Sequence, residues 1–326
     1  MELAQYFTKI NEKAVCCHLC PNECTIKPGQ SGICRYRKNR DGVLYAENYG
    51  HVAGFGIDPI EKKPLYHFLP GSSILSVGTL GCNFRCDFCQ NWSIAHGQRD
   101  TIKITPQQLV DRTLRENSIG IAYTYNEPTV WYEYVYHTAK LAKEKGLKNV
   151  LVTNGYINEQ PLDRLLEFID GVNIDVKAFN DEFYKNISKG RLEDVKRTVV
   201  HCARKVHVEI TTLVIPGLND RPEEIKGMSK WLARINPAIP LHLTRYFPNY
   251  KMDIPPTPPH RLYDLRDIAR ENLEYVYIGN LLGVDNNTYC PKCSNLLIKR
   301  EYIIAAPGIS NGLCVKCGYN VYGVFE

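Results

Sequence analysis

The sequence lacks any long apolar run. No stretch of the 326 residues reaches the roughly 18 consecutive apolar residues that a membrane-spanning helix requires. The first ten residues, 1–10, also lack the basic start and apolar centre of a secretory signal. We therefore expect a protein of the reducing cytoplasm that has no membrane partner.

The sequence also lacks a strong excess of charge and the patterns of common hydrolytic sites. It has 40 lysines and arginines against 35 aspartates and glutamates, a formal net charge of +5. This excess permits a nucleic-acid partner without indicating one. No independent acid–base pair or nucleophilic triad stands out, and Cys202 lies in a helix-like segment where we expect a buried thiol. The chemistry therefore has to be sought among the other cysteines.

Cysteine is abundant, with 13 residues, and in a chain without an export signal grouped cysteines favour metal binding over disulfides. The most informative group is Cys82, Cys86 and Cys89, spaced C-x3-C-x2-C directly after the apolar run 74–80. Three thiolates can bind three irons of a [4Fe–4S] cluster and leave the fourth iron open, whereas closed clusters have four thiolates. Zinc is the alternative, but it prefers ligands in pairs, and no second pair lies near this loop.

Two further cysteine groups flank this loop. The C-terminal group has the spacing C-x2-C-x20-C-x2-C, which is typical of a tetrahedral zinc ribbon; a rubredoxin-like iron or an auxiliary cluster is the alternative. The N-terminal group has the spacing C-x2-C-x3-C-x9-C, which leaves zinc and a second cluster both open. The C-terminal ligands are Cys290, Cys293, Cys314 and Cys317, and the N-terminal ones are Cys17, Cys20, Cys24 and Cys34, with Cys16 as a spare.

The sequence divides into three predicted domains. A cysteine-rich region covers residues 1–70, an α/β barrel covers 71–283, and a zinc-ribbon-like module covers 284–326. In the middle part, short β-branched segments alternate with helix-like ones, which predicts a parallel sheet. The strand candidates are 74–80, 119–125, 149–154, 171–177, 207–215 and 241–247, with 275–279 as a further one. Six βα units predict an open (β/α)6 partial barrel, and the ribbon either closes its open side or uses its lysines to bind a macromolecule.

The cysteine loop, with Phe88 before its third cysteine, resembles the radical S-adenosylmethionine (SAM) enzymes. The resemblance implies an open-iron [4Fe–4S] cluster that binds SAM, whose cleavage after one-electron reduction releases a 5′-deoxyadenosyl radical. It also implies a SAM pocket at the strand ends. The residues that would form this pocket are Phe88, Glu127, Thr153, Asn154, Asp175, Lys177, Ile215 and His242.

Several of these pocket residues have simpler alternatives. Glu127 precedes a helix, and its carboxylate would also stabilise the helix dipole. Asp175 and Lys177 share one face of a strand, where they would either face the cofactor or pair with each other. His242 is equally well explained as a core histidine.

Over its full length, the chain resembles the radical SAM component of the AmmeMemoRadiSam system. The resemblance rests on the cysteine motif at 17–24, the run 81–92 and the Tyr-Asn-Glu-Pro turn at 125–128. It implies AMMECR-like and Memo-like partner proteins and an electron donor. The expected function is radical modification of a macromolecule, with an RNA base as a candidate. The alternatives are the activation of a glycyl-radical protein and a non-catalytic metal-stabilised binding module.

Overall fold

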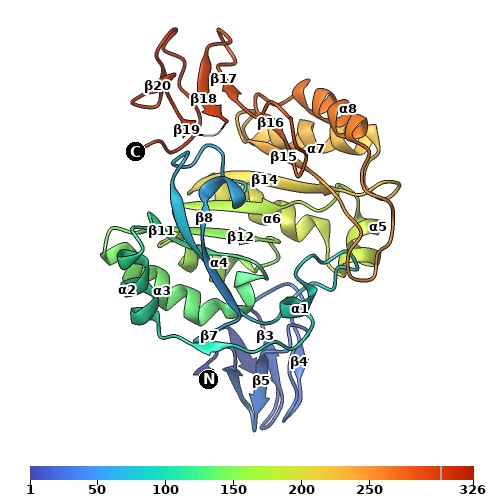
Figure 1. Ribbon diagram of the computed structural model, residues 1–326. Helices are drawn as coiled ribbons and strands as arrows, with labels where there is room; N and C mark the ends of the chain where they lie inside the picture. Colours follow the sequence, from blue (N-terminus) through green and yellow to red (C-terminus); the bar gives the residue numbers. More distant parts are fainter. Residues whose placement is uncertain (302) are drawn as a thin grey trace.

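An eight-stranded sheet forms the centre of the protein (Figure 1). The computed structural model describes residues 1–301 and 303–326. The strand order is β16-β15-β14-β13-β12-β11-β9-β8; all neighbours are parallel except β8 and β9. The strands are β8 (Gly54–Pro59), β9 (Ser73–Gly78), β11 (Gly120–Tyr123), β12 (Lys148–Thr153), β13 (Gly171–Asp175), β14 (His207–Val214), β15 (Leu241–Arg245) and β16 (Val276–Gly279). The predicted α/β partial barrel is confirmed, and 275–279 does form a strand of the sheet.

Helices alternate with these strands, as the sequence predicted. Helix α3 contacts β11 and β12, α6 contacts β14, and α8 contacts β15 and β16. Thr105 caps α2 by accepting from the Gln108 N–H at 3.2 Å, and the Gln108 side chain accepts from the Thr105 N–H. The helices are η1 (Ile60–Lys62), α1 (Trp92–Ala95), α2 (Pro106–Arg115), η2 (Pro128–Trp131), α3 (Tyr132–Glu144), α4 (Glu159–Leu166), α5 (Asp181–Phe183), η3 (Tyr184–Ser188), α6 (Leu192–Ala203), α7 (Pro222–Ile235) and α8 (Pro259–Arg270).

The N-terminal region forms small sheets at one end of the molecule (Figure 1). Its strands are β1 (Glu2–Leu3), β2 (Phe7–Lys9), β3 (Val15–Cys17), β4 (Thr25–Ile26), β5 (Arg37–Arg40), β6 (Val43–Ala46) and β7 (His51–Val52), which pairs with β10 (Ile102–Lys103). The region also supplies β8, which the sequence did not predict because Gly54, Gly56 and Pro59 are poor strand formers. The domain boundary near residue 70 stays a prediction.

The C-terminal segment forms short hairpins at the other end of the molecule (Figure 1). Its strands are β17 (Thr288–Tyr289), β18 (Leu296–Arg300), β19 (Ile304–Ala305), β20 (Ile309–Ser310) and β21 (Leu313–Cys314). The Tyr322 hydroxyl accepts from the Val208 N–H at 3.1 Å, and the Tyr319 hydroxyl donates to Glu274 at 2.9 Å. Both partners lie near the amino-terminal ends of strands, so the segment covers the end of the sheet opposite the carboxyl ends of the strands.

Across residues 1–301 and 303–326, no helix combines the length and the apolar character needed to cross a membrane.

Candidate radical SAM active site

A cavity of about 630 Å³ lies at the carboxyl ends of the parallel strands. This is the edge of an α/β barrel where active sites form, because the loops that follow the strands meet there. The cavity brings together most of the predicted site residues. They are Cys82, Cys86, Phe88, Cys89, Glu127, Thr153, Asn154, Asp175 and Lys177.

The three cysteines of the loop after β9 face this cavity. The Cys82 sulfur accepts from the Phe84 N–H at 3.4 Å and from the Asn154 side-chain amide at 3.8 Å. Burial raises the pKa of the Cys89 thiol to about 11. A bound metal would reverse this shift, because coordination deprotonates thiols. Three thiols on one cavity wall, with N–H donors directed at sulfur, fit the three-cysteine ligation of a [4Fe–4S] cluster.

Glu127 is buried at the start of η2, and both of its carboxylate oxygens accept hydrogen bonds. Oε1 accepts from the Thr153 hydroxyl at 2.7 Å and from the Thr129 N–H at 2.9 Å. Oε2 accepts from the Asn154 N–H at 2.8 Å. Burial raises the pKa of Glu127, and these donors act in the opposite direction. Glu127 therefore caps η2 and joins the ends of β11 and β12, while it also lines the cavity.

Asp175 and Lys177 lie at the end of β13 and pair at 3.0 Å between Oδ2 and Nζ. Burial alone would lower the pKa of Lys177, but Asp175 and Cys86 raise it above its ordinary value. The Lys177 ammonium is 5.8 Å from the centre of the Phe88 ring. A protonated lysine therefore lies beside the cysteine loop, where it can balance thiolate charge.

Ile215 and His242 are not among the described residues that line this cavity. Ile215 is fully buried, and its N–H donates to Asn219 Oδ1 at 2.6 Å. His242 lies near the start of β15, where its Nε2 is 2.7 Å from Glu209 Oε2 in the interior of the sheet. The structure thus places His242 in a buried polar cluster below the cavity.

Sequence reasoning missed two polar residues around the cysteine loop. Asn83 receives a hydrogen bond from the Asn154 side chain at 2.8 Å and donates to the Tyr156 carbonyl at 2.7 Å. Ser188 is buried, and its side chain lies next to Cys86. Asn83 stands between two cysteine ligands in sequence, which is a usable signal, whereas Ser188 carries none.

A row of aromatic rings begins in the cavity wall and continues onto the surface. His96 lines the cavity and stacks on Tyr250 with ring centres 5.7 Å apart. Tyr250 stacks in turn on Trp92 at 5.5 Å, and both rings are exposed. Burial and the cations Arg85 and Lys251 lower the pKa of His96 to about 4. The mouth of the cavity therefore combines stacked rings with positive charge.

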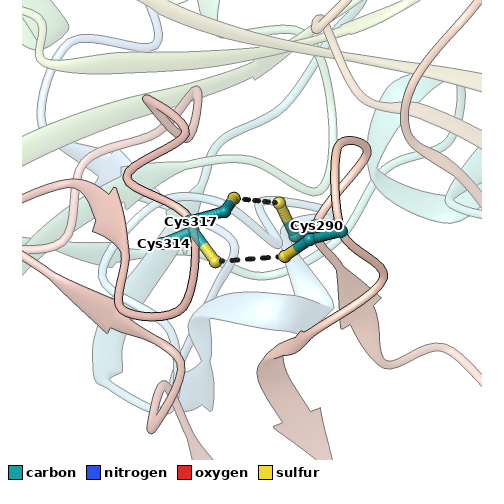
Figure 2. A group of neighbouring side chains, drawn as sticks. Cys290, Cys314 and Cys317 are labelled. Carbon is teal, nitrogen blue, oxygen red and sulfur yellow. Dashed lines mark hydrogen bonds between the residues drawn. The ribbon is translucent and has the colours of Figure 1, made fainter.

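The C-terminal cysteines form a compact group whose four sulfurs lie within 4.8 Å of one another (Figure 2). Cys290 and Cys317 are 3.6 Å apart between sulfurs, and Cys293 and Cys314 are 3.8 Å apart. A tetrahedral site with zinc–sulfur bonds of about 2.3 Å places its sulfurs roughly 3.8 Å apart. The structure thus contains the predicted C-terminal cysteine cluster with the dimensions of a single-metal site.

Comparisons with known proteins agree with this geometry. The family model described as the radical SAM superfamily matches residues 76–230. An uncharacterized protein of Methanocaldococcus jannaschii is 43% identical over 334 residues, covering 98% of this chain and 99% of that protein. The pyruvate formate-lyase 1-activating enzyme of Escherichia coli K12 is 27% identical over 176 residues, covering 51% of this chain and 71% of the enzyme.

Solved structures share the fold at low sequence identity. The crystal structure of Streptococcus suis SuiB bound to S-adenosylmethionine has a similar fold. The match covers 72% of this chain and 56% of the SuiB chain, with a TM-score of 0.51 and 13% sequence identity. The family match spans the cysteine loop and the strands that form the cavity. The chain belongs to the radical SAM superfamily, whose members use a [4Fe–4S] cluster and SAM, and it is homologous to glycyl-radical enzyme activating enzymes.

Proposed function

We propose that this radical SAM enzyme modifies a base of an RNA. The observation that carries the proposal is the row of His96, Tyr250 and Trp92 at the cavity mouth. Proteins recognise single-stranded RNA by stacking unpaired bases on exposed aromatic rings. Trp92 and Tyr250 offer such rings beside the cavity that holds the cysteine loop.

Positive charge beside these rings supports an RNA over a neutral substrate. The Lys251 ammonium lies 5.2 Å from the centre of the Tyr250 ring, and Arg85 Nη1 is 3.3 Å from His96 Nδ1. Cations near a stacked base can bind the adjoining phosphates. The mild overall charge of +5 does not oppose this. The lysines of the C-terminal module lie at the other end of the sheet and contribute nothing at this mouth.

Inside the cavity, we assign Cys82, Cys86 and Cys89 as ligands of the cluster. When bound and reduced by one electron, such a cluster would supply the electron that breaks the sulfonium S–C bond of SAM, giving methionine and a 5′-deoxyadenosyl radical. Glu127 and Asn154 would position SAM from the ends of β11 and β12. The Lys177 ammonium, paired with Asp175, would balance negative charge beside Cys86.

The first experiment measures 5′-deoxyadenosine by mass spectrometry after anaerobic reconstitution with SAM and dithionite. Wild type should form this product, whereas Cys86→Ala should form none and yet keep its fold, because the cysteine loop is outside the sheet. Circular dichroism checks the fold. Unfolding of Cys86→Ala together with absence of product from wild type would support the non-catalytic binding module instead.

The second experiment measures binding of bulk tRNA at increasing salt. Binding should weaken as salt rises, because phosphate contacts release counterions. Trp92→Ala should weaken binding by about 1–3 kcal/mol, the usual value of one base–aromatic stack, whereas Trp92→Phe should retain most of it. Equal binding by both variants, or no retention by wild type at low salt, would remove RNA as the substrate.

The second candidate is the activation of a partner protein by formation of a glycyl radical. It is supported by the 27% identity with the Escherichia coli activating enzyme over half of this chain. That reaction requires a protein substrate, so a protein-borne glycyl radical in electron paramagnetic resonance spectra of treated cell extract, and no modified RNA, would favour it.

We also propose that the chain is the radical SAM component of the AmmeMemoRadiSam system, which implies AMMECR-like and Memo-like partners and an external electron donor. Affinity purification of the tagged protein from its native cells, followed by mass spectrometry, tests these partners. Recovery of neither partner under anaerobic, low-salt conditions would count against this association.

For the C-terminal cysteines we propose zinc. The sulfur separations of 3.6 and 3.8 Å match a tetrahedral zinc site. The metal would replace a core that is too small to hold these hairpins together. Metal analysis of Cys293→Ala should show about one zinc fewer per chain than wild type.

A further inference from the structure

The N-terminal cysteines line a second cavity, separate from the one described above. Its walls include four sulfur-bearing residues, Cys17, Cys20, Cys24 and Cys34. They come from the end of β3, the following turn, the position just before β4 and the loop before β5. Cys16 is not part of this wall, and its sulfur lies 3.6 Å from the Glu23 carbonyl oxygen.

The spacing of these four sulfurs differs from that of the C-terminal group. Among the described residues, only the C-terminal cysteines form a group of three or more ligand atoms that all lie within 4.8 Å of one another. The N-terminal four are therefore more widely spread than a single zinc ion requires. The same is true of Cys82, Cys86 and Cys89, for which the family implies a [4Fe–4S] cluster. A four-iron cluster separates its thiolates because each binds a different iron.

The wall of this cavity also contains an unpartnered buried donor. Arg37 is 2% exposed and pairs with Glu133 at 2.9 Å through Nη1. Among the described residues, no atom accepts a hydrogen bond from the Arg37 Nε–H group. A buried N–H without an acceptor costs about 1–3 kcal/mol. Cluster sulfides and thiolates would provide the missing acceptor and carry negative charge beside a cation.

Backbone N–H groups are directed at the same sulfurs. The Ile33 N–H donates to the Cys24 sulfur at 3.5 Å. The backbone N–H groups of Asn22 and Tyr36 are directed at the sulfurs of Cys20 and Cys34. Hydrogen bonds from the backbone to sulfur are one of the ways in which proteins tune iron–sulfur clusters.

The second cavity lies directly against the SAM-cluster loop. The Asn22 side chain donates to the Asn83 carbonyl at 2.9 Å. Asn83 directly follows Cys82 in the SAM-cluster loop and also lines the second cavity. A Cβ at Gly81 would lie 2.5 Å from the carbonyl oxygen of Cys34. The residue before the first cluster cysteine is thus in backbone contact with the last cysteine of the N-terminal group.

We propose that Cys17, Cys20, Cys24 and Cys34 bind a second, closed [4Fe–4S] cluster that passes electrons to the SAM-binding cluster. Four thiolates leave no open iron, so this cluster cannot bind SAM or substrate through iron. It would accept one electron from a reduced ferredoxin- or flavodoxin-type protein and pass that electron on, with no bond made or broken. The relay, but not the metal site, rests on the proposed function.

Removing the other cluster tests the metal site. The triple variant Cys82→Ala, Cys86→Ala and Cys89→Ala should retain about four irons per chain after anaerobic reconstitution, and wild type about eight. The reduced triple variant should show the electron paramagnetic resonance signal of a [4Fe–4S]⁺ cluster. Zinc in place of iron, or no metal beyond the C-terminal zinc, would overturn the site.

Matched single variants test the relay. Cys20→Ala should lose about four irons, whereas Cys16→Ala should lose none because its thiol is outside the cavity. With a reduced ferredoxin as donor, Cys20→Ala should lose most of its 5′-deoxyadenosine formation, and with dithionite it should keep more. Equal rates for Cys20→Ala and Cys16→Ala with ferredoxin would overturn the relay. Wild type that contains both clusters but forms no product would overturn the proposed function alone.

Discussion

Glu127 shows how closely single residues are held at this site. Its two oxygens accept from Thr153, Thr129 and Asn154. Glu127→Gln replaces one acceptor by an NH₂ group, which sets a donor against a buried N–H. We expect a loss of about 1–3 kcal/mol in the free energy of unfolding in urea, together with reduced 5′-deoxyadenosine formation. Exposed Glu116→Gln is the control and should stay within about 0.5 kcal/mol. If Glu127→Gln unfolded at the same urea concentration as wild type, the result would contradict this account.

At the residue scale, the sequence predicted which side chains face inward but not how deep they lie. Glu127, Thr153 and Asp175 stand at strand ends, and the structure brings them to one cavity. His242 shares the inward face of its strand, yet it lies near the strand's start and contacts Glu209. Alternation along a strand gives the face of a residue, whereas its depth depends on how neighbouring strands are staggered.

Gly78, the last residue of β9, leads to the second prediction, which concerns an element. A Cβ at this position would lie 2.6 Å from the Thr124 carbonyl oxygen, a backbone atom that cannot rotate away. Gly78→Ala should therefore displace the turn before Glu127, cost about 1–3 kcal/mol and lower product formation.

Gly56→Ala in the neighbouring strand β8 is the matched control. Its added methyl would meet only the Tyr125 hydroxyl at 3.7 Å, an ordinary contact. Thermal unfolding of both variants measures the difference. Equal melting temperatures would show that the turn tolerates the methyl.

At the element scale, the sequence predicted helices and strands that carry a strong local signal, and it did not predict those whose local signal is weak. The Thr105–Pro106 start of α2 was visible because capping chemistry is local. Strand β8 was not visible, because it is specified by its antiparallel pairing with β9 and by contacts such as Tyr125 with Asp58. Such a strand depends on its partner, which the local sequence does not contain.

At the scale of the whole molecule, a buried polar cluster joins the segment between β8 and β9 and the C-terminal segment to the sheet. Glu209 Oε1 accepts from the His67 N–H at 2.7 Å, and His67 Nδ1 is 2.7 Å from the Tyr322 carbonyl oxygen. His207 and His242 contact the same carboxylate at 3.0 and 2.7 Å. Burial lowers the pKa of His67 to about 3; burial would raise the pKa of Glu209, but its histidine partners bring it below the ordinary range.

This cluster predicts loss of stability in acid. Below the ordinary histidine pKa of about 6.5, the unfolded chain binds a proton at His67 that the folded chain refuses, so stability falls as pH falls from about 6.5 toward 3. Glu209 adds to the loss below about pH 4.5 for the same reason. His67→Gln should show a shallower decline between pH 6.5 and 5 in urea unfolding. If the free energy of unfolding fell equally steeply with pH in wild type and His67→Gln, the result would contradict this assignment.

Cysteine spacing predicted a division into three parts, which stays a prediction, but it did not predict where the C-terminal segment lies. The C-terminal segment was expected either to close the open side of the barrel or to bind a macromolecule. The structure places it at the amino-terminal ends of the strands, and binding of a macromolecule there stays a prediction. The contacts that fix it there involve Tyr319, Tyr322 and Glu274, whose pairing joins residues far apart in the chain.

That arrangement has a consequence for the order of events in a catalytic cycle. The layer of His67, Glu209, His242 and Tyr277 fills the interior of the sheet beneath the cavity. This layer closes the cavity from below, and His96 in the cavity wall leads to the exposed rings of Tyr250 and Trp92. If the proposed large substrate covered these rings, it would hinder the exchange of small molecules with the cavity, so SAM would bind before the substrate and methionine would leave after it.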